Sequence, residues 1–209
     1  MWILPTRSRP KNLVRFFRLF EETGASQWGI VYVDDDDACL DEYKRVELPE
    51  NWSMVVAPRI GLGATINKAF TDNPNEPFYG MVTDDSIPVT PKWDEALSEA
   101  AGSSFIAYCS NDISVFGHCC LGGDLVREIG WIILPGLVRL YGEDVLMDIG
   151  HEKNVLRHVR NVFIDHWHFS NGKAPMDEVY MKPEASADKA IYEAWRKAPN
   201  PTICCVKWG

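Results

Sequence analysis

The protein has 209 residues, 46% of them apolar, with eight tryptophans and a formal net charge of −9, which suits one domain with a substantial core. No stretch reaches the roughly 20 apolar residues of a membrane-spanning helix, and the negative charge argues against broad affinity for nucleic acid. The six cysteines show no zinc-finger or C-x-x-C spacing, and the first residues lack the plan of a secretion signal. We therefore expect reduced thiols in a cytoplasmic protein without a membrane segment.

Short apolar runs alternate with amphipathic stretches through the first half of the chain. Such runs predict buried strands, and apolar residues spaced along one face predict helices. The predicted strands are residues 2–4, 29–33, 52–57 and 78–82, and the predicted helices are residues 11–23 and 61–70. Pro88 and Pro91 predict a turn after the fourth strand. This alternation predicts an α/β fold with a mostly parallel sheet flanked by helices.

The second half of the chain alternates less regularly. Apolar spacing predicts helices in four places and strands in three. The helices are residues 93–101, 124–129, 137–149 (interrupted near Gly142) and 185–197, and the strands are residues 105–108, 115–120 and 161–167. We expect Asp124 to cap the second of these helices.

Polar side chains follow three of the predicted strands. Because the carboxyl ends of parallel strands meet at one edge of a sheet, these side chains are expected to converge there. Arginines in a loop before a helix suit phosphate groups, and carboxylates suit Mg²⁺ or Mn²⁺ shared with a diphosphate. The residues are Thr6, Arg7 and Arg9 after the first strand, Asp34 and Asp35 after the second, and Asp84 and Asp85 after the fourth. Together they predict a site for a nucleoside diphosphate.

The ordered motifs P-T-R-S-R-P, V-D-D, G-A-T-I-N-K-A-F and V-T-D-D-S-I-P resemble the GT-A glycosyltransferase superfamily, in its family-2-like branch. The compact chain is also similar to bacteriophage glycosyltransferase-like proteins. The resemblance implies a single Rossmann-like GT-A domain over residues 1–180, with residues 181–209 forming a helix and tail packed on it. It further implies metal-dependent transfer of a sugar from a nucleotide-diphosphate sugar, of the UDP type, to an acceptor hydroxyl. Mn²⁺ or Mg²⁺ would be the cofactor.

The resemblance assigns roles to the residues of these motifs. The usual D-x-D motif has Ser86 at its third position here, so Asp85 is the expected metal ligand and Asp84 the carboxylate near the sugar and ribose. The other assignments are Thr6, Arg7 and Arg9 at the nucleotide, Asp34 and Asp35 at the base and ribose, and Asn67 and Lys68 at the diphosphate or sugar.

Two downstream segments extend the resemblance. The segment L-Y-G-E-D-V resembles the family's acidic acceptor motif, which makes Glu143 or Asp144 the general base of an inverting displacement, with Asp144 preferred. In D-H-W-H-F, two histidines two residues apart share one face of a strand. His166 and His168 are thus candidate additional metal ligands, and Lys173 a candidate for the diphosphate. Asp177 and Tyr180 would order the closing segment.

Alternatives remain open at this point. Ser86 favours a catalytically degenerate module that binds a nucleotide sugar without turnover. A sugar-nucleotide transferase would normally show a glycine-rich loop after the first strand, and P-T-R-S-R-P contains no glycine. The acceptor is a glycan or a modified DNA base, and the sugar, the nucleotide and the oligomeric state are undetermined.

Overall fold

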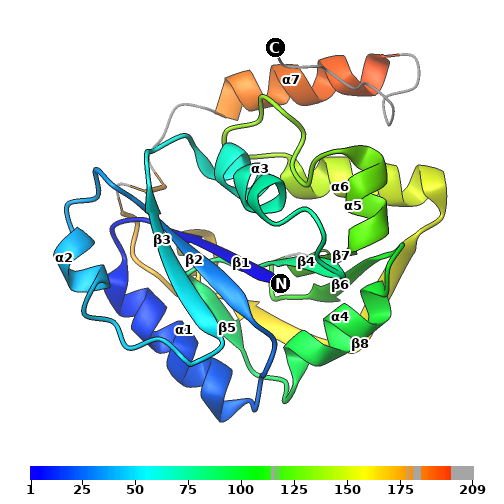
Figure 1. The fold of residues 1–209 in the computed structure, drawn as a ribbon. Coiled ribbons are helices and arrows are strands. Elements are labelled where there is room, and N and C mark those ends of the chain that lie inside the picture. The colour runs from blue at the N-terminus through cyan, green and yellow to red at the C-terminus, as the bar shows by residue number, and fades with distance from the viewer. Residues whose placement is uncertain (114–115, 117, 178, 181–184, 199–209) are drawn as a thin grey trace.

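The computed structural model describes residues 1–113, 116, 118–177, 179–180 and 185–198. Figure 1 shows its arrangement of strands and helices. The strands are β1 (Trp2–Thr6), β2 (Gly29–Asp34), β3 (Trp52–Ala57), β4 (Phe78–Met81), β5 (Ser86–Pro88), β6 (Ile106–Ser110), β7 (His118–Gly122) and β8 (Leu156–His166). The helices are α1 (Pro10–Glu22), α2 (Leu40–Tyr43), α3 (Leu62–Asp72), α4 (Trp93–Ala101), α5 (Gly123–Ile129), α6 (Gly142–Lys153) and α7 (Ala185–Lys197), with a 3₁₀ turn η1 (Phe169–Asn171).

These strands form one eight-stranded sheet in the order β3-β2-β1-β4-β7-β6-β8-β5. The half built from β3, β2, β1 and β4 is parallel throughout. In the other half β7 runs antiparallel to β4 and β6, β6 is parallel to β8, and β5 is antiparallel to β8. The predicted α/β fold is confirmed: the protein is a single Rossmann-like α/β domain with a mostly parallel sheet.

Helices cover both faces of the sheet (Figure 1), with α1 and α4 on one face and α3, α5 and α6 on the other. Alternate residues of β1 therefore enter different core clusters. Trp2 packs with the α1 and α4 side, where its ring lies 4.6 Å from that of Trp93, and Ile3 packs with the α3, α5 and α6 side. Burial on both faces explains why the strands read as continuous apolar runs.

Several side chains of helix α7 contact the domain, among them Trp195 and Asp188. Trp195 is buried in the α3, α5 and α6 core. The carboxylate of Asp188 accepts hydrogen bonds from the backbone N–H groups of residues 138, 139 and 140 at 2.8–2.9 Å. These bonds fix the loop before α6. The tail, residues 199–209, lies outside the described residues, and no helix in the described part of the chain is long and apolar enough to span a membrane.

Several element boundaries differ from the prediction. The predicted turn at Pro88 is partly the strand β5, an edge position that tolerates proline. The helix predicted from residue 137 begins only at Gly142, and the strand predicted from residue 161 begins at Leu156. Helix α5 is preceded by Gly122 rather than capped by Asp124, whose carboxylate pairs with Arg127 instead. Two residues of the predicted strand 115–120 lie outside the described part.

Candidate functional site

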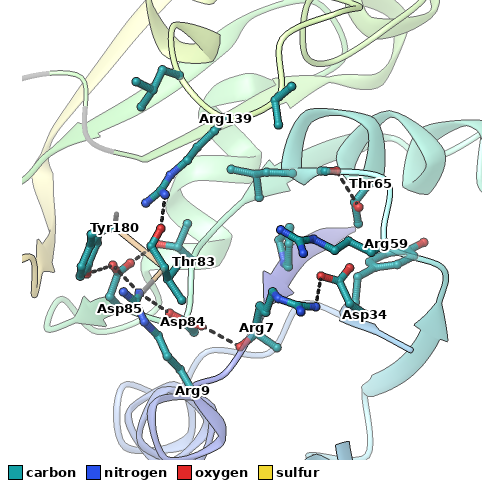
Figure 2. Close-up of a pocket in the computed structure, with 18 of the residues that line it drawn as sticks. Arg7, Arg9, Asp34, Arg59, Thr65, Thr83, Asp84, Asp85, Arg139 and Tyr180 are labelled. Atoms are coloured by element: carbon teal, nitrogen blue, oxygen red, sulfur yellow. Dashed lines mark hydrogen bonds and ion pairs between the residues drawn. The ribbon is translucent and has the colours of Figure 1, made fainter. Parts of the chain in front are cut away.

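A cavity of about 300 Å³ opens at the carboxyl ends of β1, β2 and β4. Figure 2 shows its lining side chains converging from the loops after these strands, from the start of α3 and from the C-terminal segment. Nine of the residues predicted from sequence line it: Thr6, Arg7, Arg9, Asp34, Asp84, Asp85, Glu143, His166 and His168. The convergence follows from the topology, because parallel neighbours end at the same edge.

Asp84 is buried against β1. Its Oδ2 accepts a hydrogen bond of 2.7 Å from Thr6 Oγ1, which is also 2.9 Å from the hydroxyl of Tyr43. Burial, and then the neighbouring charge of Asp85, raise the pKa of Asp84 above its usual value. Asp84 therefore ties the acidic turn to the first strand.

Asp85 has the opposite electrostatic environment. Its carboxylate accepts hydrogen bonds from Thr83 Oγ1 at 2.6 Å and from the Tyr180 hydroxyl at 2.9 Å, and its Oδ1 is 3.2 Å from His166 Nε2. Burial alone would raise the pKa of Asp85, but His166 and these hydroxyl donors outweigh it and hold the pKa below its usual range. Asp85 is thus the carboxylate of the pair whose ionised form its surroundings favour.

Arg9 bridges the acidic pair to the C-terminal segment. Its guanidinium donates to Asp177 at 2.7 and 2.9 Å, reaches Asp84 and Asp85 at 3.3 Å each, and lies 4.3 Å from the ring centre of Tyr180. Burial alone would lower the pKa of Arg9, but the carboxylates raise it. With all these partners, Arg9 holds the acidic turn in place rather than standing free for a ligand.

The opposite end of the cavity carries Arg7 and Asp34 (Figure 2). Arg7 Nη1 donates to Asp34 Oδ2 at 2.8 Å and also pairs with Asp36. Beside this pair the wall includes Tyr32, two residues before Asp34 on β2. A planar apolar wall next to a carboxylate suits a nucleobase and ribose.

Two arginines that sequence analysis missed also line the cavity, Arg59 and Arg139. Neither forms an ion pair with any described residue, although Arg139 donates to the carbonyl of Val179. Arg59 follows the end of β3, just as Arg7 follows β1, so its place after a strand was a signal available in the sequence. Arg139 lies in an irregular loop and carried no such signal.

Glu143 and Asp144 both lie in the first turn of α6, and only Glu143 lines the cavity. The Glu143 side chain is exposed to the cavity. Desolvation by the surrounding protein, and then the charge of Asp144, raise the pKa of Glu143. The sequence preference for Asp144 is not supported by this placement.

His166 and His168 both line the cavity, although β8 ends at His166 and His168 precedes η1. Burial would lower the pKa of His166, but its hydrogen bond to Asp85 raises it. His168 lies 5.2 Å from His166 between ring centres, and its Nδ1 is 2.7 Å from Ser170 Oγ. Burial, and then the charge of His166, lower the pKa of His168.

The remaining predicted residues lie outside the cavity. Asn67 accepts two backbone N–H bonds from residues 132 and 133 and donates to the carbonyl of residue 133, so it fixes a loop. Lys68 pairs with Asp72 on the surface, and Lys173 pairs with Asp112 and Asp165. Asp35 is exposed and does not line the cavity.

A divalent cation fits part of this arrangement. Two adjacent ligands at about 2.1 Å from an octahedral ion stand about 3 Å apart, close to the 3.2 Å between Asp85 Oδ1 and His166 Nε2. Within the described part of the chain, no group of three or more His, Cys, Asp or Glu side chains is placed to hold a metal. The protein thus offers two ligands, as expected where substrate phosphates and water complete the shell.

The sequence matches no protein-family model and no curated protein sequence. Solved structures do resemble the fold. A mannosyltransferase from Pyrobaculum calidifontis, in complex with GDP-Man and Mn²⁺, aligns with a TM-score of 0.64 at 12% identity over 96% of this chain. This chain spans only 65% of the mannosyltransferase's length.

Two further structures belong to mycobacterial proteins. One, described only as a mycobacterial protein, aligns with a TM-score of 0.65 at 10% identity, covering 92% of this chain and 73% of the other. The second is from Mycobacterium tuberculosis H37Rv in complex with manganese. It aligns with a TM-score of 0.51 at 13% identity, covering 78% of this chain and 87% of the other. At such identities the likeness shows the fold, a GT-A-like fold, and no more.

Proposed function

We propose that this protein transfers a sugar from a nucleoside-diphosphate sugar to an acceptor hydroxyl. The observation that carries the proposal is the contact between Asp85 and His166 at one end of a cavity whose other end carries the Arg7–Asp34 pair. Arginines and a carboxylate pair spaced along one cavity suit a nucleoside, a diphosphate and a sugar in series. The GDP-Man and Mn²⁺ bound to the Pyrobaculum mannosyltransferase agree with this proposal.

In this proposal the nucleoside lies against Tyr32, with Asp34 accepting from its hydroxyl or base N–H groups. Arg59 and Arg139 face the cavity without carboxylate partners among the described residues, so they are free to bind the diphosphate. Asp85 and His166 would hold Mn²⁺ or Mg²⁺, which neutralises charge on the leaving diphosphate. Thr6 and Arg9 keep the acidic turn in position.

Glu143 is the proposed general base, in place of Asp144. Its raised pKa brings it closer to the operating pH, which favours proton transfer. The Glu143 carboxylate accepts the proton of the acceptor hydroxyl while that oxygen bonds to the anomeric carbon. The bond from this carbon to the diphosphate oxygen breaks in the same step. Attack opposite the leaving group makes the transfer inverting. The acceptor is a glycan or a modified DNA base.

Ser86 does not weaken this arrangement. Its hydroxyl accepts a 3.0 Å hydrogen bond from the backbone N–H of Thr83 and lies 3.1 Å from Thr83 Oγ1. Ser86 therefore has a structural role in the turn that carries Asp85, and the degenerate module remains the alternative.

A thermal-shift panel tests the proposal. Nucleoside diphosphates and nucleotide sugars of each base, UDP included, would be added with and without Mn²⁺ to the wild type and to Asp85→Asn. A ligand that binds only the folded state raises the melting temperature. We expect a Mn²⁺-dependent rise with one base, lost in Asp85→Asn. No rise with any nucleotide would contradict the proposal, and a rise without subsequent donor turnover would favour the degenerate module.

A further inference from the structure

A small recess adjoins the cavity at its Asp85 end. The recess has a volume of about 60 Å³ and shares Pro5, Leu62, Thr83, Arg139 and Glu143 with the main cavity. In Figure 2, Thr83 and Arg139 lie beside Asp85, away from Arg7 and Asp34. If the nucleoside and diphosphate bind as proposed above, the recess lies next to the transferred sugar.

The walls of the recess are mostly apolar. A water molecule occupies about 30 Å³ in the liquid, so the recess accepts a substituent of a few heavy atoms and excludes a second ring. Its apolar lining comprises Leu62, Ile66, Met81, Val82, Cys119 and Ile133. Such walls favour a methyl group over a hydroxyl, which would lose its hydrogen bonds to water there.

The His118 side chain lines the recess together with Thr83, Arg139 and Glu143. It is 7% exposed, and its Nε2 has no hydrogen-bond partner among the described residues. An imidazole nitrogen forms one hydrogen bond, as donor or as acceptor. A buried polar atom without a partner costs free energy, which a ligand group in contact with it recovers.

We propose that the donor sugar carries an N-acetyl group, with its methyl inside the recess and its amide bonded to His118. The inference rests on the proposed function. An acetamido group combines the two features that the recess requires, a small apolar end and a polar end with both a donor and an acceptor. A carboxylate or an ammonium group in its place would lose its hydration against the apolar walls.

The test measures donor binding by calorimetry. Matched pairs of nucleotide sugars, N-acetylated and with a free hydroxyl at the same carbon, are compared on the nucleotide selected by the thermal-shift panel. A few buried heavy atoms in an apolar pocket discriminate by about tenfold or more, so we expect the acetamido donor to bind about tenfold more tightly. A ratio at or below one in the wild type would overturn the inference.

Two variants and one control locate the effect. Ile66→Phe fills the recess without touching the main cavity, which Ile66 does not line, and His118→Leu removes the imidazole. Each should therefore bring the ratio towards one while leaving the affinity for the nucleoside diphosphate alone unchanged. Ile60→Phe is the control, because Ile60 is exposed and lines neither space. An unchanged ratio in both variants would contradict the inference. Failure of the wild type to bind any nucleoside diphosphate would instead contradict the proposed function.

Discussion

The two ends of the cavity are built differently. The nucleoside end, with Arg7, Asp34 and Arg59, comes from three loops that each follow a parallel strand in the first third of the chain. The transfer end joins Asp85, Glu143 and His166 from segments far apart in sequence, and the contact between Asp85 and His166 shifts the pKa of both. The first end is a product of strand order alone, and the second depends on how the whole domain packs. Substitutions at the two ends should therefore have different effects on the transfer rate and on the nucleotide affinity.

The largest effect is expected at the transfer end, from Glu143→Gln. Loss of a general base costs about 10²–10⁴-fold in rate, while the affinity for donor should be unchanged because the glutamine keeps the shape of the side chain. Steady-state transfer and donor calorimetry measure the two quantities. Asp144→Asn is the matched control, since Asp144 lies in the same helical turn outside the cavity. Equal losses in the two variants would refute the assignment of Glu143.

Asn67→Ala should change stability and leave ligand affinity unaffected. The side chain accepts two backbone N–H bonds and donates one, and leaving such groups without partners costs about 1–3 kcal/mol. Chemical denaturation should show this loss. Lys68→Ala, which breaks an exposed ion pair with Asp72, should cost about 0.5 kcal/mol or less. A large fall in nucleotide affinity in Asn67→Ala would restore the ligand role predicted from sequence.

At the nucleoside end, Arg7→Gln should weaken nucleotide binding about tenfold, the value of one charged hydrogen bond. The weakening should be the same with and without Mn²⁺, because Arg7 pairs with Asp34 and Asp36 rather than with the metal-binding pair. Calorimetry measures both conditions. Arg18→Gln removes the same charge from the exposed face of α1, and this variant should bind the nucleotide as the wild type does. A loss confined to Mn²⁺-containing samples would place Arg7 at the transfer end.

The smallest expected effect is a pH dependence of stability in metal-free protein. Asp85 raises the pKa of His166 above its usual 6.5, so the folded state holds that proton more tightly than the unfolded state. The stabilisation is fully present below pH 6.5 and is lost as the pH rises through the raised pKa. The difference in unfolding free energy between wild type and His166→Gln should shrink accordingly. In an Asp85→Asn background this pH dependence should disappear, and its persistence would contradict the pairing.

The difference between the nucleoside end and the transfer end also explains which site residues could be predicted from the sequence. The strand-end pairs Arg7 with Asp34 and Asp84 with Asp85 follow local patterns, so their convergence was predictable from a parallel sheet. Asn67 shows the limit of this approach, because its motif gave no sign that its amide would bind the loop of residues 132–133. The choice of Glu143 over Asp144 depends on which side of α6 faces the cavity.

Arg139 and His118 were missed for a further reason. Arg139 lies in a loop that Asp188 of α7 holds in place, a contact across 49 residues that no local pattern reports. His118 begins β7, which pairs antiparallel with β4 and so brings the ring to the same sheet edge as the acidic turn. Both positions follow from long-range packing rather than from residue spacing.

The assignment of Asp85 as the metal ligand is tested most directly by titrating Mn²⁺ into the protein and measuring the concentration of free Mn²⁺ by electron paramagnetic resonance. The titration would use wild type, Asp85→Asn and Asp84→Asn, each with and without the nucleoside diphosphate selected by the thermal-shift panel. We predict that wild type binds Mn²⁺ tightly only with the nucleotide, that Asp85→Asn loses this binding, and that Asp84→Asn, whose carboxylate is bonded to Thr6, retains most of it. Equal Mn²⁺ affinity in wild type and Asp85→Asn would contradict the account.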